Sequence, residues 1–263
     1  MDSTDLDRRF HAAKGLVREA GQQALACYHD RASVSVERKG PQDFVSVADR
    51  DCEDFIVGAL SRLFPDDGFL GEERGQQHVR PGNAIWVIDP IDGTSNFLRG
   101  IPFWCVSLGL VLGNEAIAGI IYNPATGELY AARHESGATL DGRPIRVSAV
   151  KRLEDARIGL GFSYRRPVDV HARAVQALLG AHCEYSRLGS GALGMAMTAD
   201  ARLDGYWEAH INIWDVAAGL CIVREAGGWH SEFMNGDGFA KGNSILAATP
   251  ELVAPLRRLL HDQ

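Results

Sequence analysis

Apolar and polar positions alternate at helical spacing over residues 4–28, which predicts a long amphipathic helix there. A short strand is expected over residues 33–40, followed by a loop at Gly40-Pro41. A second helix is expected over residues 45–64, where Pro65 ends it. The runs GFLGEE (68–73) and AIWVIDP (84–90) then predict two short buried strands, each with acids at its carboxyl end.

The rest of the chain divides into a strand-rich part and an alternating part. Residues 103–113 and 115–124 flank the turn residues Gly113-Asn114 and predict a hairpin, with 127–133 as a third antiparallel strand. The second half alternates strands with helices; the strands are 157–162, 203–208 and 244–248, and the helices are 170–180, 190–200, 214–226 and 250–261. This order predicts a layered α/β or α+β protein with two sheets.

Length and composition fit one soluble domain. The 263 residues, 46% of them hydrophobic, suffice for a single domain over 1–263 with two closely packed lobes, roughly 1–150 and 151–263. No apolar run has the length of a membrane span, and the first residues lack the apolar core of a secretory signal. Five scattered cysteines without a CxxC pair are expected to be reduced core residues of a cytoplasmic protein.

The net charge of −7, without a basic tract, argues against nucleic-acid binding through a charged face. An acidic protein also repels anionic substrates, unless bound cations reverse the local field.

Several acids are expected to meet at one edge of the fold. Glu72 and Glu73 end one strand, Asp89 and Asp92 end the next, and Asp215 begins a nearly all-apolar helix. Each has an ordinary explanation by itself: Asp215 as a favourable helix start, Glu73 as a solvated acid, Asp92 as a turn former. Ligands bind at the strand ends of open α/β sheets, however, and carboxylates that converge there repel one another.

Magnesium would remove this repulsion, because it takes oxygen ligands and bridges carboxylates to substrate phosphate. None of the nine histidines has zinc-ligand spacing with a cysteine, so zinc is not expected. Two such ions would neutralise the acids and create an anion site.

The segment DPIDGTSNF, with GEE upstream and WDVAAGLCIVREAGG downstream, resembles the inositol monophosphatase family of magnesium-dependent, lithium-sensitive phosphatases. The resemblance runs from about Lys39 to Thr249. It implies a layered αβαβα sandwich of two sheets and helices, and a phosphatase that binds two or three Mg²⁺ ions.

The resemblance also assigns the metal ligands. Glu72, Asp89 and the carbonyl of Ile91 match ligands of a first ion, and Asp89, Asp92 and Asp215 match ligands of a second. Glu72 also matches the surroundings of a looser third ion.

Catalytic and phosphate-binding positions follow from the same match. Asp49 matches an acid that pairs with Thr94 near the attacking water. The resemblance therefore implies that Asp49, Thr94 and Glu72 are catalytic residues. Gly93 and Thr94 match a turn whose backbone N–H groups contact the phosphate at the start of a short helix.

The substrate side is expected around a second turn. Gly189, Ser190 and Gly191 match the substrate turn of the family, although serine and glycine stand where threonine and alanine are usual. Glu208 matches an acid that contacts the polyol, and Asp92 and Asp215 also face the substrate. Lys39 corresponds to a loop lysine near the metals, with an ordinary solvated lysine as the alternative.

The expected mechanism is hydrolysis by a metal-activated water without a covalent intermediate. Cys105 lies near the acids in sequence but within an apolar run, so we expect it in the core.

The substrate is expected to be a small phosphorylated polyol or amino alcohol, first of all myo-inositol 1-phosphate and next histidinol phosphate. Fructose 1,6-bisphosphate and 3′-phosphoadenosine 5′-phosphate are less favoured, because they would need extra basic residues near the second phosphate or an adenine slot, and residues 187–214 are not rich in either. A different class, a regulatory interaction protein of the same fold, stays open. A homodimer is expected, in part through the apolar segment 103–121.

Overall fold

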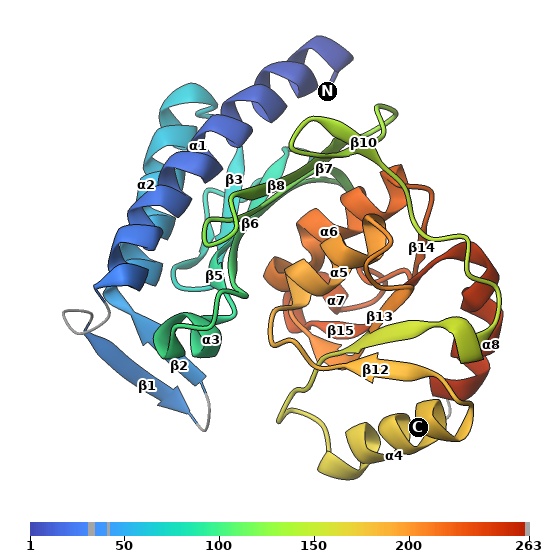
Figure 1. The fold of residues 1–263 in the computed structure, drawn as a ribbon. Coiled ribbons are helices and arrows are strands. Elements are labelled where there is room, and N and C mark those ends of the chain that lie inside the picture. The colour runs from blue at the N-terminus through green and yellow to red at the C-terminus, as the bar shows by residue number, and fades with distance from the viewer. Residues whose placement is uncertain (31–34, 41–42, 261–263) are drawn as a thin grey trace.

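The structure is a computed structural model that describes residues 1–30, 35–40 and 43–260. Figure 1 shows its layers in the order helices, first sheet, helices, second sheet, helices. This confirms the αβαβα order that the family resemblance implies. The helices are α1 (Ser3–His29), α2 (Val47–Leu63), α3 (Thr94–Arg99), α4 (Val168–Gly180), α5 (Gly191–Ala199), α6 (Ile213–Glu225), α7 (Gly238–Lys241) and α8 (Pro250–Leu260), with the 3₁₀ turn η2 (Leu153–Asp155).

The first sheet has eight strands among the described residues, in the order β10-β9-β8-β7-β6-β5-β3-β4. Strand β3 runs parallel to β5, and the other neighbours are antiparallel. The predicted hairpin and third strand are confirmed as β6, β7 and β8. The strands are β3 (Gly68–Gly71), β4 (Gly75–Gln77), β5 (Ile85–Asp92), β6 (Cys105–Leu112), β7 (Glu115–Asn123), β8 (Glu128–Arg133), β9 (Ala138–Leu140) and β10 (Arg143–Ile145).

The second sheet, in the order β12-β11-β13-β15-β14, has five strands in the part of the chain that the structure describes. Here β11 lies parallel to β12 and β13, whereas β15 is antiparallel to β13 and β14. Its strands are β11 (Arg157–Leu160), β12 (Glu184–Ser186), β13 (Gly205–Ile211), β14 (Trp229–His230) and β15 (Asn243–Ala248). A separate hairpin consists of β1 (Val36–Gly40) and β2 (Asp43–Ser46).

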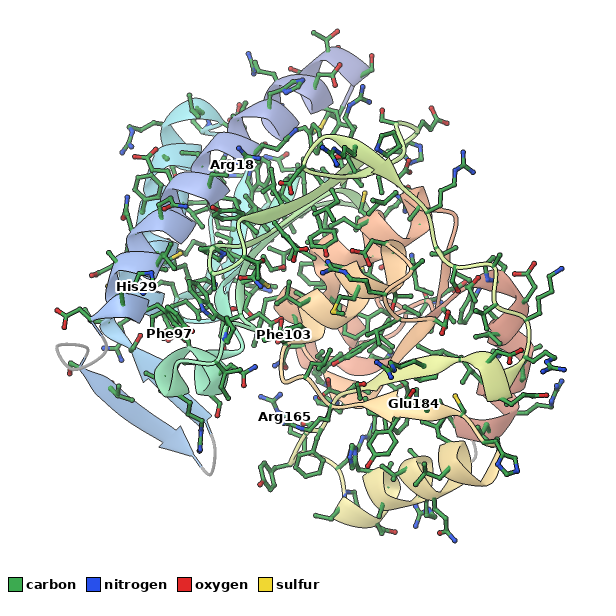
Figure 2. All side chains as sticks on the ribbon, viewed as in Figure 1. Arg18, His29, Phe97, Phe103, Arg165 and Glu184 are labelled. Carbon is green, nitrogen blue, oxygen red and sulfur yellow. The ribbon has the colours of Figure 1, made fainter. Side chains whose placement is uncertain are left out.

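The position of α6 in the core explains why almost every side of this helix carries apolar residues. One cluster of buried residues includes Val87 of the first sheet, Val216 and Leu220 of α6, and Ile245 of the second sheet. The helix lies between the two sheets and buries side chains in both directions. In contrast, α1 has only one buried face, which packs on the outside of the first sheet. Side chains fill the space between the layers in Figure 2.

The expected helix over 45–64 begins two residues later, at Val47, because strand β2 occupies Asp43–Ser46. Ser46 is the N-cap, and a capping box with Asp49 fixes the helix start there. No sequence pattern predicted β4, β9, β10, β12, β14 or α7 either. These elements are two to four residues long, which is too short to show a hydrophobic period.

Four of the five cysteines are buried, which confirms their expected place in the core, while Cys27 is partly exposed. Among the described residues, no helix combines the length and the apolar character that crossing a membrane requires.

Candidate active site

Strand β5 carries Asp89 and Asp92 to the edge of the core. Its apolar residues Trp86, Val87 and Ile88 are fully buried between β3 and β6. Asp89 lies opposite Ser107 and Asp92 opposite Cys105, so this strand has one residue more than its partner in this interval. Residues three apart in a regular strand face opposite sides of the sheet. The bulge therefore allows both carboxylates to reach the same site.

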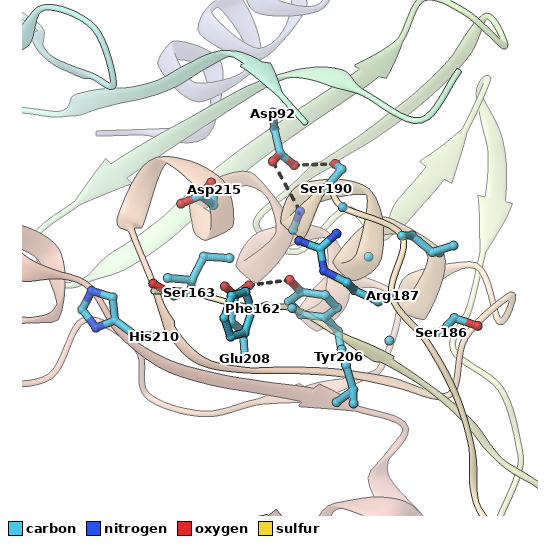
Figure 3. A pocket seen from close by; sticks show the side chains of 18 of the residues that line it. Asp92, Phe162, Ser163, Ser186, Arg187, Ser190, Tyr206, Glu208, His210 and Asp215 are labelled. Carbon is cyan, nitrogen blue, oxygen red and sulfur yellow. Dashed lines mark hydrogen bonds between the residues drawn. The ribbon is translucent and has the colours of Figure 1, made fainter. Parts of the chain in front are cut away.

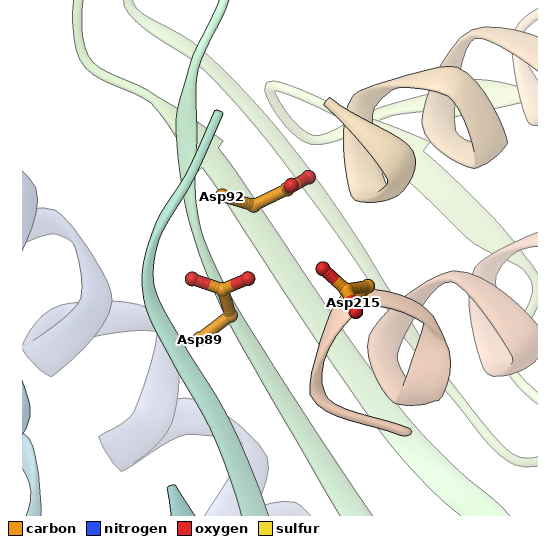
Figure 4. Close-up of side chains that lie close together, drawn as sticks. All are labelled: Asp89, Asp92 and Asp215. Atoms are coloured by element: carbon orange, nitrogen blue, oxygen red, sulfur yellow. The ribbon is translucent and has the colours of Figure 1, made fainter. Parts of the chain in front are cut away.

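Three carboxylates meet at this site. One oxygen each from Asp89, Asp92 and Asp215 lies within 4.8 Å of the other two (Figure 4). Asp215 comes from the first turn of α6, where it also forms a capping box and accepts a hydrogen bond from Asn212 N at 3.0 Å. Its ordinary role as a helix start and its place in the cluster are therefore compatible.

The cluster is electrostatically unfavourable as it stands. Burial, together with the charges of Glu72, Asp92 and Asp215, raises the pKa of Asp89 well above its ordinary value. Burial and the charges of Asp92 and Glu72 do the same to the pKa of Asp215. A divalent cation between these oxygens would remove the repulsion. The all-oxygen donor set fits Mg²⁺.

Glu72 lies beside this cluster, since its charge raises the pKa of both Asp89 and Asp215. Its backbone N–H donates to the carbonyl of Ile88 at 3.2 Å, which places it next to the end of β5. The carbonyl of Ile91 accepts a hydrogen bond from the Thr94 hydroxyl at 3.0 Å.

Asp49 is almost fully buried, and both the N–H and the hydroxyl of Ser46 donate to its Oδ2. Its Oδ1 is buried without a hydrogen-bond partner among the described residues. Burial raises the pKa of Asp49 to about 6, against the effect of the Ser46 hydrogen bonds. The expected pairing with Thr94 is not formed here, because the Thr94 hydroxyl donates to Ile91 instead. The free oxygen leaves Asp49 able to bind a water molecule.

The phosphate turn and the substrate turn are in direct contact. Gly93 has φ +96°, and a side chain there would meet the carbonyls of Phe103 and Gly189 at 3.0 and 3.3 Å. Asn96 fixes the contact, since its side-chain amide donates to the carbonyls of Phe103 and Leu188. Asn96 is not among the predicted site residues, although it lies within the DPIDGTSNF segment.

Ser190 and Gly191 turn their donors toward Asp92. The Ser190 hydroxyl lies 2.5 Å from its Oδ2, Ala192 N donates to the same oxygen at 2.7 Å, and Gly191 N donates to Oδ1 at 3.3 Å. The Asp92 carboxylate therefore lies against the start of α5, which holds it with three donors. The predicted contact of this turn with substrate stays a prediction.

A cavity of about 230 Å³ opens next to these residues. It is lined by residues from both halves of the chain, among them Asp92, Asp215, Glu208 and all of Gly189–Gly191. Figure 3 shows Asp92 bonded to Ser190, and Tyr206 bonded to Glu208. The turn residues and Glu208, expected near one substrate, are thus in one cavity.

Glu208 is largely buried, and its carboxylate accepts a hydrogen bond from the Tyr206 hydroxyl at 2.7 Å. Burial raises its pKa to about 7, although Tyr206 and the charges of Arg187 and Arg165 act in the opposite direction. A side chain at Gly161 would lie 1.9 Å from Glu208 Oε2, so only glycine fits beside this acid.

Arg165 and Arg187 also line the cavity, so one basic residue from the segment 187–214 and one from outside it lie on the expected substrate side. Arg165 comes from the loop before α4, outside the segment 187–214, and bonds Asn212 Oδ1 at 3.0 Å. Figure 3 shows the Arg187 side chain near Tyr206 and Glu208. No sequence pattern links these two arginines, so only the fold reveals their proximity.

Cys105 is fully buried in β6, with Sγ 3.9 Å from Asp92 Oδ2. Burial raises its pKa well above the ordinary value, which keeps the thiol protonated and supports its expected place in the core. The side chain of Lys39 lies outside the described part of the structure, so its proposed role stays a prediction.

Comparisons with known proteins agree with the fold. The model of the inositol monophosphatase family matches residues 5–262. A relative described as inositol-1-monophosphatase, from Rhizobium meliloti (strain 1021), is 37% identical over 253 residues, which are 95% of this chain and 92% of the relative. Another, described as Nus factor SuhB, from Xylella fastidiosa (strain Temecula1), is 43% identical over 84% of this chain and 80% of its own. The crystal structure of the extragenic suppressor protein suhB from Bartonella henselae has a TM-score of 0.87 and 38% identity, and the match covers 94% of this chain and 95% of that one.

Proposed function

The chain belongs to the inositol monophosphatase family and is a phosphoric monoester hydrolase, and from this premise we propose that it hydrolyses a small phosphorylated polyol, first of all myo-inositol 1-phosphate. The observation that carries the proposal is the group of three carboxylates beside a cavity that also contains Glu208. The carboxylates at one end of the cavity would bind a cation, and the cation would bind the phosphate. Glu208 at the other side would bind the alcohol that the phosphate esterifies.

Asp89, Asp92 and Asp215, with Glu72 beside them, would hold Mg²⁺. Bound magnesium would lower the pKa of a water ligand and stabilise charge on the leaving oxygen. Asp92 would be kept in place for this by Ser190, Gly191 and Ala192.

The water and the phosphate would be oriented by residues of this chain. Asp49 has a buried carboxylate oxygen without a described partner, and this oxygen can accept a proton or a hydrogen bond from water. Gly93 and Thr94 begin the short helix α3, whose first backbone N–H groups have no acceptor within the helix. These N–H groups can donate to phosphate oxygens.

The charges around Glu208 favour a polyol over an amino alcohol. The amine of histidinol phosphate would bind close to Glu208, where the charges of Arg187 and Arg165 also act. Like charges would weaken its binding there, whereas the hydroxyl groups of inositol can bond to the acid and to both arginines. Histidinol phosphate is therefore the second choice.

The two arginines favour one further candidate. A second phosphate needs basic residues at some distance from the reaction site, and Arg165 and Arg187 supply them. Fructose 1,6-bisphosphate therefore stays a candidate, despite the sparsely basic segment 187–214.

A regulatory interaction role is the alternative from a different class. One relative of 43% identity is described as Nus factor SuhB. The carboxylate cluster favours hydrolysis, since a protein that acts only through its surface has no use for a buried cation site. A pull-down from cell extract with the wild-type protein and Asp92→Asn separates the roles, because surface binding would survive this substitution.

The deciding experiment is a phosphate-release panel with inositol 1-phosphate, histidinol phosphate, fructose 1,6-bisphosphate and 3′-phosphoadenosine 5′-phosphate, with and without Mg²⁺. The highest kcat/KM is expected for inositol 1-phosphate. No phosphate release is expected without Mg²⁺. A higher kcat/KM for histidinol phosphate would contradict the proposed substrate. Release that persists in a chelator would contradict the proposed metal.

Three properties expected from the family belong to the same proposal: inhibition by lithium, a homodimer and a cytoplasmic location. Lithium inhibition uncompetitive with substrate would support the first, and full activity in high lithium would contradict it. Light scattering at micromolar concentration tests the second, and a monomer would contradict it.

A further inference from the structure

Glu53 is a fully buried acid of α2 that has no assigned role in the reaction. Its two carboxylate oxygens accept hydrogen bonds from the backbone N–H groups of Glu73 and Arg74, each at 2.9 Å. A buried carboxylate is costly unless donors compensate it, and here the turn after β3 supplies both donors. The acid and the turn therefore depend on each other.

Gly71, the last residue of β3, makes room for this acid. A Cβ atom at Gly71 would lie 2.0 Å from Glu53 Oε1, well inside van der Waals contact. The strand can approach α2 this closely only because it ends on glycine. Glu53 thus lies against Gly71, the residue before Glu72, and accepts a hydrogen bond from the backbone N–H of Glu73, the residue after it.

Helix α2 also contacts the end of β5. Cys52 lies next to Glu53, and its Sγ donates to the carbonyl of Pro90 at 3.4 Å. One helix therefore touches the two segments that carry Glu72 and Asp89, and can fix the distance between them.

We infer that Glu53 is a positioning residue, whose carboxylate holds the turn after β3 so that Glu72 faces Asp89 and supports divalent-cation binding. This inference rests on the proposed function, in which Glu72 is a ligand of Mg²⁺. In this role Glu53 is not itself a ligand of substrate or cation. It acts through the backbone on both sides of Glu72.

The test is Glu53→Gln, measured by calorimetric titration with Mg²⁺ alone. Glutamine has the same size, but its NH₂ group faces one of the two backbone N–H donors, so the turn must move. The Kd for Mg²⁺ is expected to rise about tenfold, the usual effect of losing support behind a metal ligand. At saturating Mg²⁺, kcat should return close to the wild-type value.

Asp54→Asn is the matched control. Asp54 neighbours Glu53 on α2 and pairs with the Arg74 side chain on the same turn, but this ion pair is exposed. Exposed pairs contribute little, so the Kd for Mg²⁺ should not change. An unchanged Kd in Glu53→Gln, or an equal rise in both variants, would contradict the inference.

Two further measurements apply if Glu53→Gln does not fold. Glu53→Asp keeps the charge but is too short to reach both donors, and it should raise the Kd in the same direction. Hydrogen exchange of the wild-type Glu73 and Arg74 amides should be slow, and fast exchange would contradict the inference. A wild-type protein that binds no Mg²⁺ would instead refute the proposed function itself, before any variant is compared.

Discussion

The hydroxyl of Ser190 lies 2.5 Å from Oδ2 of Asp92, although the two residues are 98 positions apart in the chain. Asp92 ends a strand of the first sheet, and Ser190 caps α5, which lies between the two sheets. The first half of the chain thus supplies an acid whose orientation depends on the second half.

Ser190→Ala should weaken the site without unfolding the protein. Asp92 keeps the N–H donors of Gly191 and Ala192 but loses a hydrogen bond to a charged group, worth about 1.5–3 kcal/mol. We expect kcat/KM to fall roughly tenfold to a hundredfold. Ser163→Ala is the control, because Ser163 lines the same cavity and its hydroxyl accepts only from Arg165 N at 3.3 Å among the described contacts. Equal losses in both variants would contradict this role of Ser190.

Asp92→Asn and Asp215→Asn should each lower kcat by orders of magnitude, because each would remove an anionic ligand from the proposed cation, which would stabilise the transition state. Circular dichroism should show an unchanged fold. Asp66→Asn, at an exposed acid away from the cluster, serves as control and should have wild-type activity. Near-normal turnover of both cluster variants at saturating Mg²⁺ would exclude them as metal ligands.

Asp89→Asn should stabilise the metal-free protein at pH 8. The pKa of Asp89 is raised in the folded state, so the folded protein holds a proton that the unfolded chain releases. Stability is therefore lost as the pH rises from about 4 toward the folded pKa. Asparagine avoids this loss and can still accept the hydrogen bond from Ile91 N.

Urea unfolding in a chelator should therefore give a higher free energy of unfolding for Asp89→Asn than for wild type, by roughly 0.5–3 kcal/mol. The difference should shrink at pH 5. Added Mg²⁺ should reverse it, since only the wild type then gains from the cation. A variant less stable than wild type at every pH would show that Asp89 is not destabilised in the metal-free site.

Glu208 should determine substrate specificity without taking part in the bond-breaking step. Glu208→Ala would remove the proposed charge-assisted hydrogen bond to the alcohol, worth about 1.5–3 kcal/mol. We expect kcat/KM for inositol 1-phosphate to fall by one to two decades, with little change for a featureless aryl phosphate. An equal loss for both compounds would mean that Glu208 supports the metal site instead.

The pKa of Glu208 adds a pH test to this prediction. Because it is raised to about 7, the acid is mostly protonated at pH 6 and mostly ionised at pH 8. The ratio of the two kcat/KM values, polyol phosphate over aryl phosphate, should therefore rise about tenfold over this interval. In Glu208→Gln the ratio should stay constant, and a rise there would assign the titration to another group.

The sequence predicts the layers and the gathering of acids, because long hydrophobic periods and the DPIDGTSNF motif are local. It does not predict how Asp89 and Asp92 reach the same side of the sheet. The alternation of a strand puts residues three apart on opposite faces, and the bulge that overcomes this is a property of the pairing with β6.

Two other parts of the site were missed for a related reason. Arg165 and Arg187 belong to separate loops, and only the second sheet brings them to one cavity. The expected Asp49–Thr94 pair fails because each residue has a nearer partner, Ser46 and Ile91, within its own turn. Local hydrogen bonds of this kind compete with contacts between distant segments.

The hydrogen bond between Ser190 and Asp92 also bears on the stage of folding at which the protein becomes active. Closing a loop of 98 residues is slow compared with forming a helix, so we expect this contact to form late in folding. During refolding, the helical signal should thus recover before activity does, and simultaneous recovery would contradict this order. A nascent chain in which only the first sheet has folded contains Asp89 and Asp92 but should have no enzymatic activity.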